Sequence, residues 1–313
     1  MHDPVMVKEV LDGLALRAGG VYLDGTLGDG GHALALLERL QGACVLIGVD
    51  RDPEALARAA GRLAPWREQC RLAHGNFAEM GGIAERFGFT AVDGIILDLG
   101  VSSEQLDMPE RGFSFRQAGP LDMRMDQTGA GVTAAELLAG ADERKLRDWL
   151  WRFGDEPAAG RVARAILRAR DRGALRTTMD LAETVAQARR QSGGRIHPAT
   201  RAFQALRIVV NRELECLEKG LEAALQILRP GGRLAVLSYH SLEDRLVKQT
   251  ARRHMLRRES LQAGGWRAIG DAPLARAVTR KPLPPTAAET RSNPRARSAR
   301  LRVIEICQSY QGA

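Results

Sequence analysis

The chain has few residues of the kinds that cross-link, hold zinc or stack on bases. Its 313 residues include four cysteines, Cys44, Cys70, Cys216 and Cys307, and no Cys-x-x-Cys pair. A disulfide framework and a metal site are therefore not expected. Cys44 and Cys307 lie in apolar, strand-like runs, and we expect both to be core thiols. Phe, Trp and Tyr make up only 4% of the sequence, so rings for stacking on bases are scarce.

Long apolar runs and acidic excess are also missing. No stretch is long enough to cross a bilayer, and the N-terminal residues include Asp3 and Glu9 rather than the apolar core of a secretory signal. We therefore expect a cytoplasmic protein without a membrane partner. The net charge of +8 indicates a polyanionic partner.

The most informative segment of the chain is 21–31. A short apolar strand ends in Asp24, a glycine-rich turn follows, and His32 opens an apolar helix. A second apolar strand, 44–49, ends in Asp50. This pattern predicts a βαβ nucleotide-binding unit, in which glycines let the backbone approach a ligand and the second acid holds ribose hydroxyls.

The acids of the glycine-rich turn indicate which nucleoside cofactor would bind. Asp24 and Asp29 would repel a pyrophosphate placed at the start of the helix. They suit a ligand that carries an amine and a positively charged sulfur, which favours S-adenosylmethionine over NAD. The alternative is that both acids only cap the loop and the helix.

The order of predicted elements indicates an α/β protein with an insertion. Strands at 21–23, 44–49, 70–73 and 94–99 alternate with helices, which predicts a parallel sheet covered on both faces. Helices and no clear strand are expected between residues 107 and 211, and a strand-like run returns at 232–239. We expect one domain formed by 1–106 and 212–313, and an inserted helical domain, 107–211, that recognises substrate.

Polar residues follow two of the predicted strands. Asp98 ends the buried run 94–99, and His240 and Ser241 follow the run 233–238, so all three should emerge at the carboxyl edge of the sheet. We therefore take Asp98, His240 and Ser241 as the candidate catalytic residues. Asp98 could instead cap its turn. A hydrolase is not favoured because no Gly-x-Ser-x-Gly elbow is present, and the His-Ser pair also fits a hydrogen-bonded structural role.

Two irregular segments also have unusual composition. Residues 107–125 lack helical periodicity but are too rich in Gly, Phe, Met and Pro for a plain linker, which is typical of a functional loop. Residues 260–300 are rich in Arg and Pro and lead to a final strand at 301–306. We expect a flexible basic loop that contacts RNA phosphates through Arg291, Arg295, Arg297 and Arg300. The alternatives are a solvated loop or arginines that brace the core.

Several long blocks, in order along the chain, resemble the bacterial 16S rRNA cytosine-N4 methyltransferase family (RsmH/MraW). The resemblance runs from His2 to Arg302 and includes Asp24-Gly-Thr-Leu-Gly-Asp-Gly-Gly-His32, Asp50-Arg-Asp-Pro53, 93–103, Arg111-Gly-Phe-Ser-Phe115, 119–126, His197-Pro-Ala-Thr-Arg201, 203–207, His240-Ser-Leu-Glu-Asp-Arg245 and Asn293-Pro-Arg-Ala-Arg-Ser298. Minor departures are Tyr239, where the family usually has Phe, and Thr286, where Ser is common.

The resemblance implies a class I S-adenosylmethionine-dependent methyltransferase fold, Rossmann-like with a mostly parallel sheet and an inserted helical domain. It implies S-adenosylmethionine-dependent methylation of a cytidine amine in the decoding region of 16S rRNA, within the small ribosomal subunit. It assigns cofactor contacts to Gly30, Gly31, His32, Asp50, Phe77, Asp98 and Gln105. From its place after the third strand, we expect Phe77 to pack on adenine, although core packing explains it nearly as well.

The target amine itself indicates what the catalytic residue must do. An exocyclic cytosine amine is a poor nucleophile because its lone pair is delocalised into the ring, so a hydrogen-bond acceptor is needed, and Asp98 is the best choice. Phe113 and Phe115 are candidates for stacking on the base. Two rival functions are a catalytically silent rRNA-binding assembly factor and an NAD-dependent oxidoreductase. The sequence does not determine the oligomeric state.

Overall fold

The chain folds as two compact units. The computed structural model describes residues 4–189, 197–255, 257–260, 266–269 and 274–308. One unit combines Met1–Gly100 with Leu214–Ala313, and the other is Val101–Glu213. These boundaries fall a few residues from the expected 106/107 and 211/212. Within the described residues, no helix is both long and apolar enough to span a membrane.

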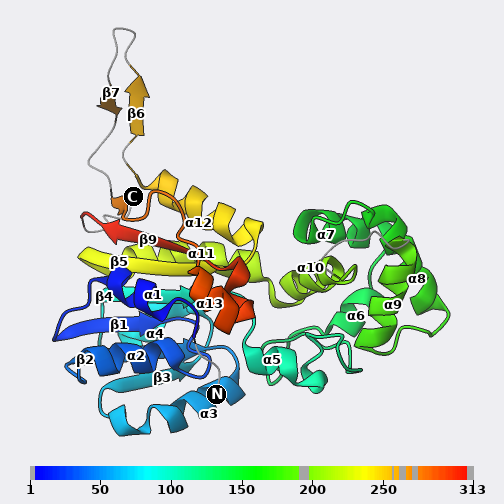
Figure 1. The fold of residues 1–313 in the computed structure, drawn as a ribbon, viewed down its shortest axis with the longest axis horizontal. Coiled ribbons are helices and arrows are strands. Elements are labelled where there is room, and N and C mark those ends of the chain that lie inside the picture. The colour runs from blue at the N-terminus through cyan, green and yellow to red at the C-terminus, as the bar shows by residue number, and fades with distance from the viewer. Residues whose placement is uncertain (1–3, 190–196, 256, 261–265, 270–273, 309–313) are drawn as a thin grey trace. The chain divides into compact units, whose positions relative to one another are not determined.

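A mostly parallel sheet forms the centre of the first unit (Figure 1). Within the described residues it has seven strands in the order β3-β2-β1-β4-β5-β9-β8. The strands are β1 (Gly20–Asp24), β2 (Cys44–Asp50), β3 (Cys70–His74), β4 (Val92–Asp98), β5 (Leu228–Ser238), β8 (Ala275–Ala277) and β9 (Arg300–Ile306). Strands β1 to β5 pair in parallel, and β9 is antiparallel to β5 and β8. The expected class I, Rossmann-like fold is confirmed. A separate pair, β6 (Arg257–Ser260) and β7 (Trp266–Ile269), is antiparallel.

Helices cover both faces of this sheet because its strands carry apolar side chains on both sides. Tyr22, Leu46 and Ile96 belong to the core that includes α1 (Val7–Leu14), α2 (Gly31–Arg39) and α3 (Pro53–Arg62). The alternate strand residues Leu23 and Ile47 belong to the core on the other face. That core includes α4 (Met80–Arg86), α11 (Glu213–Ile227) and α12 (Ser241–Arg253).

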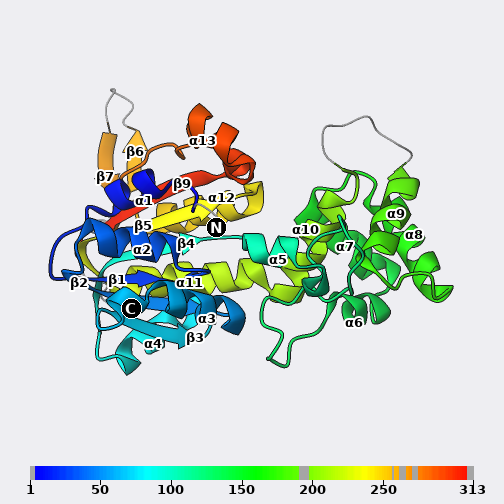
Figure 2. The ribbon, with the colours of Figure 1, turned by 60° about the horizontal axis from the view of Figure 1, so that its bottom comes forward.

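The second unit is helical in its described part (Figure 2). Its α-helices are α5 (Ser103–Asp107), α6 (Ala134–Ala139), α7 (Glu143–Gly154), α8 (Ala159–Asp171), α9 (Thr178–Arg189) and α10 (Thr200–Asn211). Its β-pairing among described residues is an isolated bridge between Pro120 and Thr177. Buried leucine, valine and alanine side chains of these helices form a core separate from the two cores of the sheet.

The basic C-terminal segment differs from its prediction. We expected a flexible loop, but Arg291 lies in the helix α13 (Ala287–Ser292), and a 3₁₀ turn, η4, spans Pro294–Ser298. The Thr286 side chain caps α13 by accepting the Glu289 amide, and Ala296 is fully buried. Local caps of this kind leave no periodic pattern in the sequence. Residues 261–265 and 270–273 of the segment lie outside the described residues.

One cysteine prediction is also wrong. Cys44 is buried at the start of β2, as expected, but Cys307 is exposed. Strand β9 ends at Ile306, which is fully buried, so the residue after it has left the core.

Candidate cofactor and catalytic site

The glycine-rich loop after β1 has a backbone shape that requires glycine. Gly28 and Gly30 have φ of +52° and +76°, in the left-handed region that other residues rarely adopt. The Asp50 carboxylate holds this loop, because one oxygen accepts the Gly28 amide at 2.7 Å and the other accepts the Asp52 amide at 2.8 Å. Carboxylate oxygens have further lone pairs, so Asp50 can also accept from a ligand hydroxyl. The ribose contact of Asp50 remains a prediction.

Asp98 lies at the end of β4 and is held from three sides. Its backbone amide donates to the Thr26 hydroxyl at 2.6 Å, and its Oδ1 accepts the Tyr239 hydroxyl at 2.8 Å. Its Oδ2 lies 3.8 Å from Nδ1 of His32. The Asp98 side chain is 24% exposed, so its carboxylate is held firmly but remains reachable by a ligand.

His32 opens α2, as predicted, and its ring is almost fully buried. Its Nε2 lies 2.9 Å from the Val5 carbonyl oxygen, which can only accept a hydrogen bond. Nε2 therefore carries a proton, and Nδ1 is the atom that faces Asp98. The ring links the N-terminal segment to the carboxylate at the end of β4.

The acids around this loop form a region of negative charge inside the protein. Burial is the main reason that the pKa of Asp24 is raised to about 7; the nearby Asp98 and Asp50 act in the same direction, and His32 and the Thr26 amide oppose them. Burial also raises the pKa of Asp98, while His32 and the Tyr239 hydroxyl act in the opposite direction. The pKa of Asp50 is raised by burial as well. Like charges in a poorly solvated region are costly, so these residues fit a ligand whose reactive end is positively charged.

Other residues predicted to contact the cofactor have structural partners here. Asp29 forms an ion pair with Arg58, with 2.7 Å between Oδ1 and Nε. The half-buried Phe77 ring packs so closely on Gly220 that a Cβ there would lie 2.4 Å from the ring. Gln105 belongs to the helical unit, where it closes a capping box with Ser102 at the start of α5. The cofactor contacts of Phe77 and Gln105 remain predictions.

His240 and Ser241 begin helix α12. The His240 side chain caps the helix, and Glu243 accepts the backbone amides of Tyr239 at 2.8 Å and of His240 at 3.2 Å. His240 Nε2 also lies 3.1 Å from a Glu243 oxygen, and Ser241 is exposed. These contacts account for His240 as a residue that starts the helix, and no described contact connects the pair to Asp98.

Sequence reasoning did not assign a role to Tyr239. Its hydroxyl donates to Asp98, a residue 141 positions earlier in the chain. The feature that brings Tyr239 to Asp98 is the parallel pairing of β4 with β5, in which Asp98 lies opposite Leu237. A residue just after β5 therefore emerges beside the last residue of β4.

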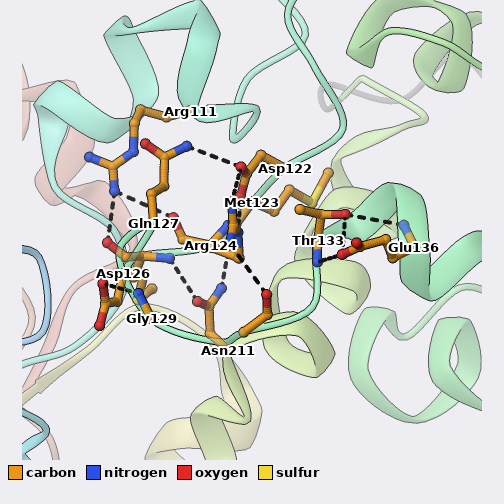
Figure 3. Close-up of polar contacts among 12 residues, drawn as sticks. Arg111, Asp122, Met123, Arg124, Asp126, Gln127, Gly129, Thr133, Glu136 and Asn211 are labelled. Atoms are coloured by element: carbon orange, nitrogen blue, oxygen red, sulfur yellow. Dashed lines mark hydrogen bonds and ion pairs between the residues drawn. The ribbon is translucent and has the colours of Figure 1, made fainter.

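The irregular segment 107–125 is fixed by buried polar contacts within the helical unit (Figure 3). The Arg111 guanidinium, 2% exposed, donates to the Met125 carbonyl at 2.8 Å. Asn211, at the end of α10, accepts the Met125 amide and donates to the Met123 carbonyl. Asp122 pairs with Arg124 through both oxygens. These contacts hold the segment in place although it lacks helical periodicity.

The two rings proposed to stack on the base lie in this unit. Phe113 is 7% exposed and belongs to the core, so it presents no free face to a base. The ring of Phe115 packs 4.6 Å from His197 and 4.8 Å from Phe203, measured between centroids. The expectation for Phe113 is therefore wrong in this structure.

The four arginines predicted to contact RNA all lie in the first unit. Arg291, Arg297 and Arg300 are exposed, and Arg295 is half-buried. The segment that carries them is anchored by Ala296 and Ala299 rather than by the arginines. Their guanidinium groups are therefore presented on a fixed backbone, and their RNA contacts remain predictions.

Comparisons with known proteins find similarity along almost the whole chain. The model described as the MraW methylase family matches residues 1–307. The chain is 46% identical to the ribosomal RNA small subunit methyltransferase H of Symbiobacterium thermophilum, covering 100% of this chain and 98% of that protein. It is also 48% identical to the protein of the same name from Nitratidesulfovibrio vulgaris strain DP4, covering 97% of this chain and 95% of that protein. The protein of that name from Acidiphilium cryptum is 48% identical as well, covering 97% of each chain.

Proposed function

Since the chain belongs to the MraW methylase family, we propose that it methylates the N4 amine of a cytidine in the decoding region of 16S rRNA, using S-adenosylmethionine. The observation that carries this proposal is Asp98, a reachable carboxylate at the end of β4 beside the glycine-rich loop. The substrate is the rRNA within the small ribosomal subunit, and the protein acts in the cytoplasm. The relatives named above are small-subunit rRNA methyltransferases, which supports this substrate.

The residues around the glycine-rich loop fit the cofactor. S-adenosylmethionine supplies an electrophilic methyl group on a positively charged sulfur when it is bound. Gly30, Gly31 and His32 would hold its methionine end, and Asp24 would offset its positive charge. Asp50 would accept from the ribose hydroxyls. Phe77 would pack on the adenine, and Gln105 would complete the contacts.

Asp98 would act on the cytidine. Its carboxylate accepts a hydrogen bond from the N4 amine and draws the nitrogen lone pair out of conjugation with the ring. When N4 gains the methyl group, it loses a proton, and the ionised carboxylate is the acceptor at hand. Tyr239 is a positioning residue, because its hydroxyl fixes Oδ1 of the carboxylate.

The substrate must be brought to this carboxylate out of folded RNA. The target base has to leave its stack before its amine can reach Asp98. The helical unit would recognise the substrate, and Arg291, Arg295, Arg297 and Arg300 would contact phosphates. His240 and Ser241 retain only a structural role in this scheme. A catalytically silent assembly factor is not favoured, because the family is one of methylases.

A transfer experiment tests the proposal. Tritium-labelled S-adenosylmethionine is incubated with small ribosomal subunits that lack the modification, and label in the rRNA is counted. We expect incorporation with the natural protein and near-background incorporation with Asp98→Asn at saturating cofactor. No incorporation by the natural protein would reject the function, and near-normal turnover by Asp98→Asn would remove Asp98 from the chemistry.

A further inference from the structure

A hollow of about 690 Å³ lies in the first unit, outside the residues assigned to the cofactor. Helix α12 forms one wall, and the segment from Pro284 to Arg300 forms the other. Its volume falls within the roughly 300–1,000 Å³ of ligand pockets. We call it the basic hollow, because Arg245, Lys248, Arg297 and Arg300 all line it.

The positive charge of the basic hollow is not neutralised by the protein. Within the described part of the chain, no hydrogen bond or ion pair involves the side-chain nitrogens of Arg245, Lys248, Arg297 or Arg300, and all four residues are exposed. The acid in its wall, Asp244, is already paired with Arg302 through both oxygens, at 2.7 and 3.1 Å. Four unpaired cations around one concave surface attract a polyanion.

The sequence puts two of these cations on α12, where they were not predicted. Arg245 and Lys248 are three residues apart on the helix, so their side chains project from the same face. Arg297 and Arg300 come from the opposite wall, at η4 and the first residue of β9. Cations on two facing walls suit a chain of phosphates that runs between them, rather than one small anion.

The basic hollow is lined by a residue that contacts the proposed catalytic carboxylate. Tyr239 lines the hollow, and its hydroxyl is 2.8 Å from Oδ1 of Asp98. The Tyr239 side chain therefore lies between an RNA strand in the hollow and the Asp98 carboxylate. When a nucleotide is flipped, the phosphates on either side of it must be anchored close to the site while the base is out of its stack.

We propose that the basic hollow binds the rRNA backbone beside the target cytidine, with Arg245 and Lys248 as phosphate contacts in addition to Arg297 and Arg300. This inference rests on the proposed function, which supplies RNA as the substrate. It adds a binding surface on α12 and a path for the strand past Tyr239.

The test compares two double variants with equal loss of charge. Arg245→Ala/Lys248→Ala removes the α12 side of the hollow. Arg67→Ala/Arg86→Ala is the matched control, because both of its arginines are exposed in the same unit and line no part of the hollow. Methyl transfer to small subunits gives KM and kcat, and binding of a fluorescein-labelled single-stranded RNA at several salt concentrations gives the salt slope.

We expect the hollow variant to raise KM for small subunits about tenfold or more with kcat nearly unchanged. Its salt slope should be smaller by roughly 0.7–0.9 for each lost contact. Cofactor affinity and melting temperature should match those of the control. A charge reversal, Lys248→Glu, should weaken RNA binding further than Lys248→Ala.

A hollow variant with the KM and salt slope of the control would overturn the inference. The RNA-binding measurement keeps this result separate from a failure of the proposed function. If the natural protein binds RNA but transfers no methyl group, the proposed function fails. The salt slopes of the two variants then still decide whether the hollow binds RNA.

Discussion

Replacing Tyr239 with Phe removes one hydroxyl and leaves the ring. That hydroxyl donates to Oδ1 of Asp98 at 2.8 Å, so the variant removes the side-chain hydrogen bond that the described residues make to this carboxylate. The hydrogen bond lowers the pKa of Asp98, against the effect of burial. In the variant the pKa of Asp98 should therefore rise further, and the carboxylate should be less firmly oriented.

The size of the effect follows from the kind of bond that is lost. A hydrogen bond to a charged group contributes about 1.5–3 kcal/mol. If Tyr239 acts mainly by orienting the reacting carboxylate, that loss corresponds to a roughly 10- to 150-fold lower kcat. Because only ionised Asp98 accepts the amine proton, the acidic limb of the pH–rate profile should also move to higher pH.

The assay measures kcat for methyl transfer against pH at saturating cofactor and subunits. Tyr22→Phe is the control, because the Tyr22 hydroxyl is likewise hydrogen-bonded, but to the Arg17 backbone rather than to a carboxylate. We expect the limb to move only in the Tyr239 variant. An unmoved limb with unchanged kcat would refute the reasoning. A lower melting temperature with equal loss of activity at every pH would make Tyr239 merely structural.

Two further predictions concern acids that lie around the glycine-rich loop. Asp50→Ala should weaken S-adenosylmethionine binding by about 1.5–3 kcal/mol in calorimetry, and should lower the melting temperature because two backbone amides lose their acceptor. Unchanged affinity in a folded variant would contradict the ribose contact. Asp24 has a raised pKa, from 3.8 to about 7, so it stabilises the fold fully below pH 3.8 and loses this contribution as pH rises through about 7. Asp24→Asn should therefore raise the melting temperature of the cofactor-free protein at pH 8 but not at pH 4, and an equal change at both pH values would contradict this account.

Much of the fold could be predicted because its signals are local. The strands β1, β2 and β4 are short apolar runs that end in Asp24, Asp50 and Asp98, and the structure places them side by side as parallel strands. The position of Asp98 at the edge of the sheet follows from that pattern alone. These features depend on the order of residues along a single segment.

The features that could not be predicted depend on pairs of distant segments. Tyr239 meets Asp98 only through the register of β4 with β5. Asp29 was interpreted as an acid that suits a positively charged ligand, and its ion pair with Arg58 on α3 was not foreseen. The basic segment was expected to be a loop because α13 and η4 are too short to produce a periodic pattern. Arg245 was missed because it lies on a helix of the sheet unit, away from the cluster of arginines in the sequence.

The central claim is that this chain methylates N4 of one cytidine, and identification of the product nucleoside tests it most directly. Small-subunit rRNA treated with the protein and S-adenosylmethionine is digested, and the nucleosides and the modified fragment are identified by mass spectrometry. The account predicts N4-methylcytidine at a single position in the decoding region, and its loss with Asp98→Asn. Methylation at a ring carbon, on a ribose or on another base would contradict the account.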